Sequence, residues 1–195
     1  MPTLVLATRN PGKVAELAAR LDGLGVALVS AADVAGAPEV EETEDTLQGN
    51  AALKATALHA HAGLPALADD TGLLVRALGG APGVYSARYA GPEADDAANR
   101  ARLLADLDGV EDRAARFETV LALATDTGVR LFTGVCHGRI ATTEHGAGGF
   151  GYDALFVPDD GDGRTFAEMT RDEKGRISHR GRALDAFVAA MRGGR

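Results

Sequence analysis

The chain has 195 residues, of which 46% are hydrophobic, and this is enough to bury a sizeable core. Acidic residues outnumber lysine and arginine by 28 to 20, and the net charge of −8 excludes the general basic surface that a nucleic-acid polymer requires. An anionic ligand must therefore find its countercharges locally, or through a metal that links ligand phosphates to protein carboxylates. We expect one domain over residues 1–195, with two lobes and no nucleic-acid partner.

Cysteine content and hydropathy indicate the compartment. The single Cys136 excludes an internal disulfide framework and a multi-cysteine zinc site, which suits a reducing environment. The sequence starts without a basic leader segment, and no apolar run reaches the roughly 18 residues of a membrane span. We expect a soluble, cytoplasmic protein with no membrane partner.

The N-terminal segment predicts a strand, a polar loop and a helix. Residues 4–7 form a short apolar run, and the helix has apolar positions at Val14, Leu17, Ala18 and Leu21. The loop combines unpaired N–H groups at a helix N-terminus with a hydroxyl, an amide, an ammonium and a glycine, which suits a phosphate. Its residues are Thr8, Arg9, Asn10, Pro11, Gly12 and Lys13. The alternative is an ordinary turn, because the P-loop pattern is absent.

An acidic loop follows a second strand predicted over residues 26–29. Its five carboxylates between residues 39 and 45 are typical of a solvated face. Alternatively, Glu41 or Glu42 turns inward to share a divalent cation with Asp70, because such ions prefer oxygen ligands. The number of carboxylates does not select between them.

The alanine-rich segment 47–62 predicts a helix with Asn50, Lys54 and Leu58 on one face. The simpler interpretation of Lys54 is that it extends outward to solvent, and the alternative is that it points along the helix to a phosphate. His59 and His61 lie two residues apart and cannot share a helix face, so a paired metal site is not expected.

Residues 66–73 are the centre of the functional interpretation, because an apolar run ends there in two adjacent carboxylates, a hydroxyl and a glycine. They read Ala-Leu-Ala-Asp-Asp-Thr-Gly-Leu. Adjacent aspartates repel each other, so a fold that keeps both at the end of a buried strand needs a cation, a proton or strong donors beside them. The alternative is a solvated turn, for which Asp-Asp-Thr-Gly is suitable chemistry.

The middle of the chain predicts an irregular loop, a helix and a hairpin. Residues 79–91 are rich in glycine and proline and contain two tyrosines and an arginine, which suit a ligand wall or, preferably, a subunit contact. A helix over 93–107, with Ala97, Ala101 and Leu104 on its apolar side, precedes two strands predicted at 117–124 and 129–137.

A second glycine-rich loop over 146–153 leads into a strand predicted at 154–157. Its spacing does not fit a dinucleotide-binding fingerprint. Phe150 could stack on a purine while backbone groups and Asp153 read the edge of the base. A hairpin with packed aromatic side chains is the alternative.

The C-terminal segment predicts a capping box at 165–168, a polar link that contains Lys174, and a terminal helix capped by Ser178. The apolar face of this helix consists of Leu184, Phe187, Val188 and Met191. His179 and Arg180 fall in its first turn, where positive charge is unfavourable, and a bound anion would remove the conflict.

Together these segments resemble the inosine/xanthosine triphosphate pyrophosphatase family nearly end to end. Each motif is weak alone, but their order and separation are specific. The segments are 8–13, 41–43, 50–51 with Lys54, 68–73, 80–89, 149–153 and 178–181. The resemblance implies an elongated α/β fold with a long mixed central sheet, flanking helices and two lobes around a cleft, working as a homodimer. It implies hydrolysis of deaminated purine nucleotides, ITP, dITP and XTP, to monophosphate and pyrophosphate with Mg²⁺, which keeps these bases out of DNA and RNA.

The resemblance also implies roles for individual residues. Asp70 corresponds to the general base and also to one of the metal ligands. Glu42 is the preferred second metal ligand, and Glu41 is the alternative. Thr71 corresponds to a substrate contact. Thr8, Arg9, Asn10, Pro11, Gly12 and Lys13 correspond to the triphosphate loop, and Phe150, Gly151, Tyr152, Asp153, Lys174, His179 and Arg180 to the contacts on the side of the base. Leu47 and Gly49 depart from the commonest pattern, in which an aromatic and an acidic residue precede Asn50.

The chemistry agrees with these roles. A carboxylate deprotonates water for attack on the α-phosphorus, and Lys13, with Lys54 if it faces the phosphates, stabilises the leaving pyrophosphate. A hydrogen-bond donor beside the purine 6-position can donate to the carbonyl of inosine or xanthosine, but it finds no acceptor in the amino group of adenosine. Three other functions fit parts of the pattern: a pyrophosphatase for modified pyrimidine nucleotides, a non-catalytic nucleotide sensor and a metal-dependent phosphomonoesterase.

Overall fold

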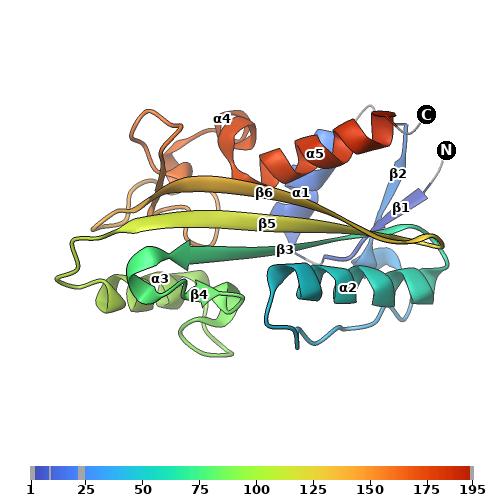
Figure 1. The fold of residues 1–195 in the computed structure, drawn as a ribbon, viewed down its shortest axis with the longest axis horizontal. Helices are drawn as coiled ribbons and strands as arrows, with labels where there is room; N and C mark the ends of the chain where they lie inside the picture. Colours follow the sequence, from blue (N-terminus) through green and yellow to red (C-terminus); the bar gives the residue numbers. More distant parts are fainter. Residues whose placement is uncertain (1–2, 9, 22–24, 194–195) are drawn as a thin grey trace. The chain divides into compact units, whose positions relative to one another are not determined.

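The computed structural model describes residues 3–8, 10–21 and 25–193. The strands in this part of the chain are β1 (Thr3–Leu6), β2 (Ala27–Ser30), β3 (Ala66–Val75), β4 (Pro82–Gly83), β5 (Ala114–Thr125), β6 (Gly128–Ile140) and β7 (Phe156–Pro158). The helices are α1 (Pro11–Leu21), α2 (Leu47–Ala62), α3 (Asp96–Asp106), α4 (Arg171–Ile177) and α5 (His179–Gly193). The strands pair in the order β2-β1-β3-β5-β6-β7, with β4 also paired to β3 (Figure 1). The predicted α/β fold with a mixed central sheet and flanking helices is confirmed.

The chain divides into two compact units. The first contains residues 1–70, 119–134 and 183–195, and the second contains residues 71–118 and 135–182. Strands β3, β5 and β6 and helix α5 each contribute residues to both units. The division falls between Asp70 and Thr71, two neighbouring residues of the predicted site.

In the first unit, β1 pairs in parallel with β2 and with β3. Leu4 and Leu6 of β1 pack in one cluster with residues of α1 and α5, whereas Val5 packs in another with Leu58 of α2. This alternation follows from the two-residue period of a strand. Accordingly, α1 and α5 lie on one side of these strands and α2 lies on the other (Figure 1).

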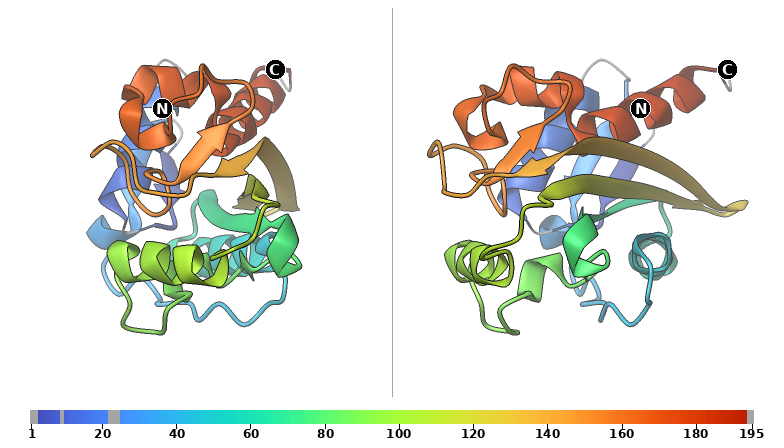
Figure 2. Two further views of the ribbon diagram at one scale, coloured as in Figure 1. Left: turned by 90° about the vertical axis from the view of Figure 1, so that its left-hand side faces the viewer. Right: turned by 60° about the vertical axis from the view of Figure 1, so that its left-hand side comes forward.

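In the second unit, β3 pairs antiparallel with β4, and β6 pairs antiparallel with β7. Helix α3 and the orange segment that carries β7 and α4 lie on opposite sides of β5 and β6 (Figure 2). The core of this unit includes Leu103 of α3, Phe117 of β5 and Phe156 of β7. The rings of Phe117 and Phe156 meet edge to face, with 4.7 Å between their centroids.

Most predicted elements are present, but the predicted face of α3 is wrong at two positions and that of α1 at one, although Leu17 and Leu21 of α1 are buried as predicted. Helix α2 has the predicted ends, and the predicted hairpin is β5 with β6, each longer than expected. In α3, Ala97 and Ala101 are exposed, and the buried positions are Asn99 and Leu103. The amide of Asn99 is satisfied there, because it accepts from Ala90 N–H at 2.8 Å and donates to the Ala87 carbonyl at 3.1 Å. In α1, Ala18 is exposed.

Within the described residues, no helix is both long and apolar enough to cross a membrane.

Candidate active site

The loop before α1 is organised by Asn10. Thr8 Oγ1 accepts a hydrogen bond from Asn10 N–H at 3.2 Å, and Asn10 Oδ1 accepts from Gly12 N–H at 2.9 Å and from Lys13 N–H at 3.2 Å. The prediction that this helix end presents unpaired N–H groups is therefore wrong for Gly12 and Lys13, because Asn is itself a good helix cap. Pro11 begins α1, and Arg9, a predicted member of the loop, lies outside the described residues.

The two aspartates of the central motif lie within β3 and not in a turn, which corrects the solvated-turn alternative. Asp69 and Asp70 are buried, with exposed fractions of 2% and 6%. Each carboxylate has its own lysine: Lys13 Nζ lies 2.7 Å from Asp69 Oδ1, and Lys54 Nζ lies 2.7 Å from Asp70 Oδ1. Successive side chains of a strand point to opposite faces, so neighbouring aspartates can pair with lysines from different helices.

Lys54 also lies 2.9 Å from Glu42 Oε1, so one ammonium joins Glu42 and Asp70. The simpler interpretation of Lys54, an outward extension into solvent, is wrong. Glu41 and Glu42 are the two candidates to share a cation site with Asp70. The Lys54 ammonium holds Glu42 beside Asp70. Whether Lys54 contacts a phosphate stays a prediction.

The pKa values of this cluster reflect burial and mutual attraction. Burial raises the pKa of Asp70 to about 6, although Lys54 lowers it, and the charge of Glu42 adds to the increase. Burial acts to lower the pKa of Lys54, but the attraction of Asp70 and then of Glu42 outweighs it, so this pKa is raised. The pKa of Asp70 thus lies close to neutral pH, as a general base requires.

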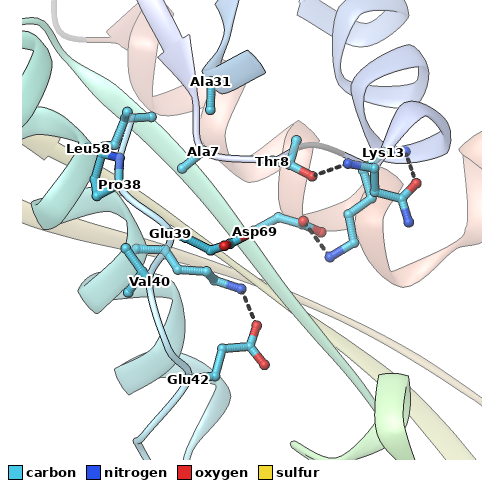
Figure 3. Close-up of a pocket in the computed structure, with 12 residues that line it drawn as sticks. Ala7, Thr8, Lys13, Ala31, Pro38, Glu39, Val40, Glu42, Leu58 and Asp69 are labelled. Carbon is cyan, nitrogen blue, oxygen red and sulfur yellow. Dashed lines mark hydrogen bonds and ion pairs between the residues drawn. The ribbon is translucent and has the colours of Figure 1, made fainter. Parts of the chain in front are cut away.

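A cavity of about 290 Å³ opens beside these residues (Figure 3). Lys13, Glu42 and Asp69 are among the charged side chains that line it, and Figure 3 shows the ion pair of Lys13 with Asp69. Thr8, Asn10 and Lys54 also line this cavity. It therefore brings together residues of the first loop, the acidic loop, α2 and β3.

Within the described part of the chain, no group of three or more His, Cys, Asp and Glu side chains could hold a metal ion. Glu42 and Asp70 nevertheless provide a donor set of carboxylate oxygens, and a single cation, Lys54 Nζ, already lies between them. Hard divalent ions such as Mg²⁺ take oxygen ligands and commonly complete their coordination with water and phosphate oxygens. The two residues fit such an ion if a ligand supplies the remaining oxygens.

A second group of predicted residues lies in the second unit, around Asp153. Asp153 Oδ2 accepts a hydrogen bond from Phe150 N–H at 2.9 Å and forms an ion pair with Lys174 Nζ at 2.7 Å. Lys174 is buried within α4, so its predicted place in a polar link is wrong. Thr170 and Glu173 form a capping box that begins this helix, a signal present in the sequence but not recognised.

Arg180 and His179 lie in the first turn of α5, as predicted, and both are buried. Arg180 Nη2 donates to Thr71 Oγ1 at 3.2 Å, and its guanidinium carbon lies 5.5 Å from the centre of the Phe150 ring. The His179 ring stacks on Phe117, with 4.4 Å between centroids. Ser178 caps the helix as predicted, because its Oγ accepts from Gly181 N–H at 3.1 Å.

The remaining predicted residues of the second loop have different environments. Tyr152 is buried in the core of its unit, and its hydroxyl donates to the Ser86 carbonyl at 2.8 Å. Burial raises the pKa of this hydroxyl. Gly151 is bound through its backbone to side chains of α3. The sequence interpretation did not find these contacts, because nothing in the local pattern links residues so far apart along the chain.

Comparison with known proteins identifies the family of this chain. A family model described as the Ham1 family matches residues 4–190. The dITP/XTP pyrophosphatase of Syntrophobacter fumaroxidans is 54% identical over 93% of this chain and 78% of its own, and that of Geobacter sulfurreducens is 51% identical over 94% of both chains.

Solved structures lead to the same family. A HAM1 protein from Coxiella burnetii has a TM-score of 0.91 at 39% identity and covers 99% of this chain and 100% of its own. A nucleoside-triphosphatase, dITP/XTP pyrophosphatase, from Mycobacterium abscessus has a TM-score of 0.78 at 47% identity and covers 95% and 98%. The family match over nearly the whole chain, with identities of about half, shows that this chain belongs to the Ham1 family.

Proposed function

We propose that this protein hydrolyses non-standard purine nucleoside triphosphates, dITP, ITP and XTP, to the monophosphate and pyrophosphate. The observation that carries the proposal is Asp70, a buried carboxylate with a pKa of about 6 that is ion-paired with Lys54 and lies next to an aspartate ion-paired with Lys13. The names of the curated relatives, dITP/XTP pyrophosphatase, support the same substrate class. Removal of such nucleotides keeps deaminated bases out of DNA and RNA.

In the proposed reaction, Asp70 accepts a proton from water, and the water oxygen forms a bond to the α-phosphorus. The bond between the α-phosphorus and the bridging oxygen breaks, and pyrophosphate leaves with that oxygen. Lys13 and Lys54 offset the charge of the triphosphate and of the leaving group. Glu42 and Asp70 would hold Mg²⁺, which when bound neutralises phosphate charge and polarises the phosphoryl oxygens.

Recognition of the base is proposed for the second group of residues. Phe150 offers an aromatic face, and Lys174, His179 and Arg180 are the donors assigned to the 6-carbonyl that separates hypoxanthine and xanthine from adenine. The two groups are adjacent in the sequence, because Asp70 of the first group is followed directly by Thr71, which accepts a hydrogen bond from Arg180 of the second. When an adenine amino group replaces the carbonyl, the buried donor loses its acceptor. The loss costs about 1 to 3 kcal/mol of binding free energy and so favours the deaminated bases.

A pyrophosphate-specific assay with ITP, XTP, dITP, ATP and GTP, with Mg²⁺ and with excess EDTA, tests this function. We expect rapid release of pyrophosphate from the first three substrates and none when the metal is chelated. Faster turnover of methylated UTP or CTP would favour a pyrimidine pyrophosphatase. Release of orthophosphate would indicate a phosphomonoesterase, and binding without any release would indicate a sensor.

We propose further that the protein works as a homodimer through the loop over residues 79–91. Tyr85 supports this surface, because the residue is 55% exposed although it is large and mostly apolar. The guanidinium carbon of Arg88 lies 5.3 Å from the centre of its ring. Tyrosine and arginine are both enriched at protein interfaces.

A further inference from the structure

The loop over residues 146–153 carries Phe150 between two glycines in left-handed backbone conformations. Gly149 has a φ of +73° and Gly151 a φ of +61°. Glycine loses more conformational freedom on folding than any other residue, so a ring between two glycines depends on contacts with neighbouring groups to hold one orientation. Asp153 of the same loop supplies one of them, through Phe150 N–H. The source of those contacts therefore bears on how Phe150 meets a ligand.

Helix α3 supplies two such contacts, and both fall on Gly151. Asp96 Oδ2 accepts a hydrogen bond from Gly151 N–H at 2.6 Å, and Arg100 Nη1 donates to the Gly151 carbonyl at 2.9 Å. Asp96 and Arg100 are four residues apart, so their side chains leave the same face of the helix. Arg100 is also fixed by an ion pair with Glu144 at 3.0 Å.

The Phe150 ring lies close to two of the residues assigned to the base. Lys174 Nζ lies 4.8 Å from the centre of the Phe150 ring, and the guanidinium carbon of Arg180 lies 5.5 Å from it. A displacement of the Gly151 peptide would turn the ring relative to both cations. The hold on Gly151 therefore helps to set the position of the ring relative to these two residues.

We propose that Asp96 and Arg100 are positioning residues for purine recognition. They hold the N–H and the carbonyl of Gly151 and so fix the Phe150 ring for stacking on the base. The assignment of the base to Phe150 rests on the proposed function, whereas the hold on the loop does not. Neither residue belongs to the group around Asp70. Their loss is therefore expected to weaken binding of the nucleotide and to leave the chemical step unchanged.

The first test measures the loop directly. The chain contains no tryptophan, so Phe150→Trp places a single fluorophore at the loop tip. In this background we expect Asp96→Ala and Arg100→Ala each to lower the fluorescence anisotropy and to increase quenching by acrylamide. Asp96→Asn keeps an acceptor oxygen for Gly151 N–H and is expected to retain the parent values.

Arg102→Ala is the matched control, because Arg102 lies on the same helix and pairs with Asp106 at 2.9 Å instead of with the loop. It is expected to leave the anisotropy unchanged. Asp96 is exposed and Arg100 is partly exposed, so these substitutions leave the core untouched, and circular dichroism verifies the fold of each variant.

The second test measures kinetics in the chain with native Phe150. For Asp96→Ala and Arg100→Ala we expect the KM for dITP to rise about tenfold and kcat to stay within about twofold of its original value, because binding and not chemistry is affected. Asp96→Asn is expected to restore KM, and Arg102→Ala to leave it unchanged.

The outcomes separate the hold on the loop from the proposed function. Unchanged anisotropy in both alanine variants, or an equal change in Arg102→Ala, would overturn the positioning role. Lower anisotropy with an unchanged KM for dITP would overturn the role in purine recognition. If the unaltered protein releases no pyrophosphate from dITP, the proposed function and its purine assignment fail, and the fluorescence measurement alone decides whether α3 holds the loop.

Discussion

Asp69 and Asp70 are adjacent in β3, yet the structure separates their charges by giving each a different lysine. Asp69 pairs with Lys13 at the start of α1, which fixes the lysine that we assign to the triphosphate. Asp70 pairs with Lys54 of α2, which it shares with Glu42. One motif thus contains a positioning carboxylate and a carboxylate suited to proton transfer.

Asp70→Asn is expected to lower pyrophosphate release from dITP by about 10²- to 10⁴-fold, the range that a general base contributes. The amide cannot accept the proton of water but has nearly the same shape, so the fold should be kept. Steady-state kinetics with a pyrophosphate-coupled assay measures the effect, with circular dichroism as the control for folding. Near-normal turnover would remove Asp70 from the mechanism.

The pKa of Asp70 also predicts a dependence of stability on pH. This pKa is raised from 3.8 to about 6, so between these values the folded state binds more protons than the unfolded state. The stability of the protein should therefore fall as the pH rises from about 4 to about 6, relative to Asp70→Asn, by about 1 to 3 kcal/mol, and then level off.

Denaturant unfolding of both proteins in EDTA at several pH values measures this difference. Because only residue 70 differs, contributions from groups that behave alike in both proteins cancel. A difference in unfolding free energy that does not change between pH 4 and pH 7 would show that the pKa of Asp70 is not raised.

At the scale of elements, the contact between α4 and α5 depends on a glycine. A Cβ at Gly181 would lie 2.0 Å from the Gly175 carbonyl oxygen, whereas a Cβ at Gly175 would meet no atom within 4 Å. The first turn of α5, which carries His179 and Arg180, can therefore approach α4 only because residue 181 lacks a side chain.

Gly181→Ala is expected to destabilise the protein by about 1 to 3 kcal/mol, because the backbone must move to admit the methyl group. The matched variant Gly175→Ala should instead stabilise it by about 0.5 to 1 kcal/mol, because alanine favours a helix and finds open space. Thermal unfolding of the two variants beside the unaltered chain measures both effects. Equal effects of the same sign would contradict this account of the contact.

At the scale of the whole molecule, the proposed homodimer assigns a role to the loop that contains Tyr85. We expect the protein to have the mass of a dimer in solution and Tyr85→Ser to shift it toward the monomer, because the substitution removes a large apolar contact. Size-exclusion chromatography with light scattering measures the mass. Leu131→Ser is the control, because Leu131 is also apolar and 46% exposed but lies on β6. An equal shift in both variants would argue against an interface at Tyr85.

Local patterns predict some elements well and some helix faces poorly. The alanine-rich composition of α2 and the polar turn between β5 and β6 are strong local signals, and both elements are where the sequence predicts them. The prediction of the buried face of α3 is wrong because Asn99 is buried there. Its hydrogen-bond partners, Ala87 and Ala90, belong to a neighbouring loop. Buried Lys174 is a similar case, since its partner Asp153 lies in a different segment.

The sequence by itself determined the family, the strand that carries Asp70, the acidic loop and the residue types needed for a polyphosphate and a purine. Only the tertiary structure decided which carboxylate pairs with which lysine, that Asn10 caps α1, and that α3 holds Gly151. Residue types and their order are properties of the chain, whereas ion pairs and hydrogen bonds between distant residues depend on how the elements pack. A local pattern contains no information about those distances until the fold brings the partners together.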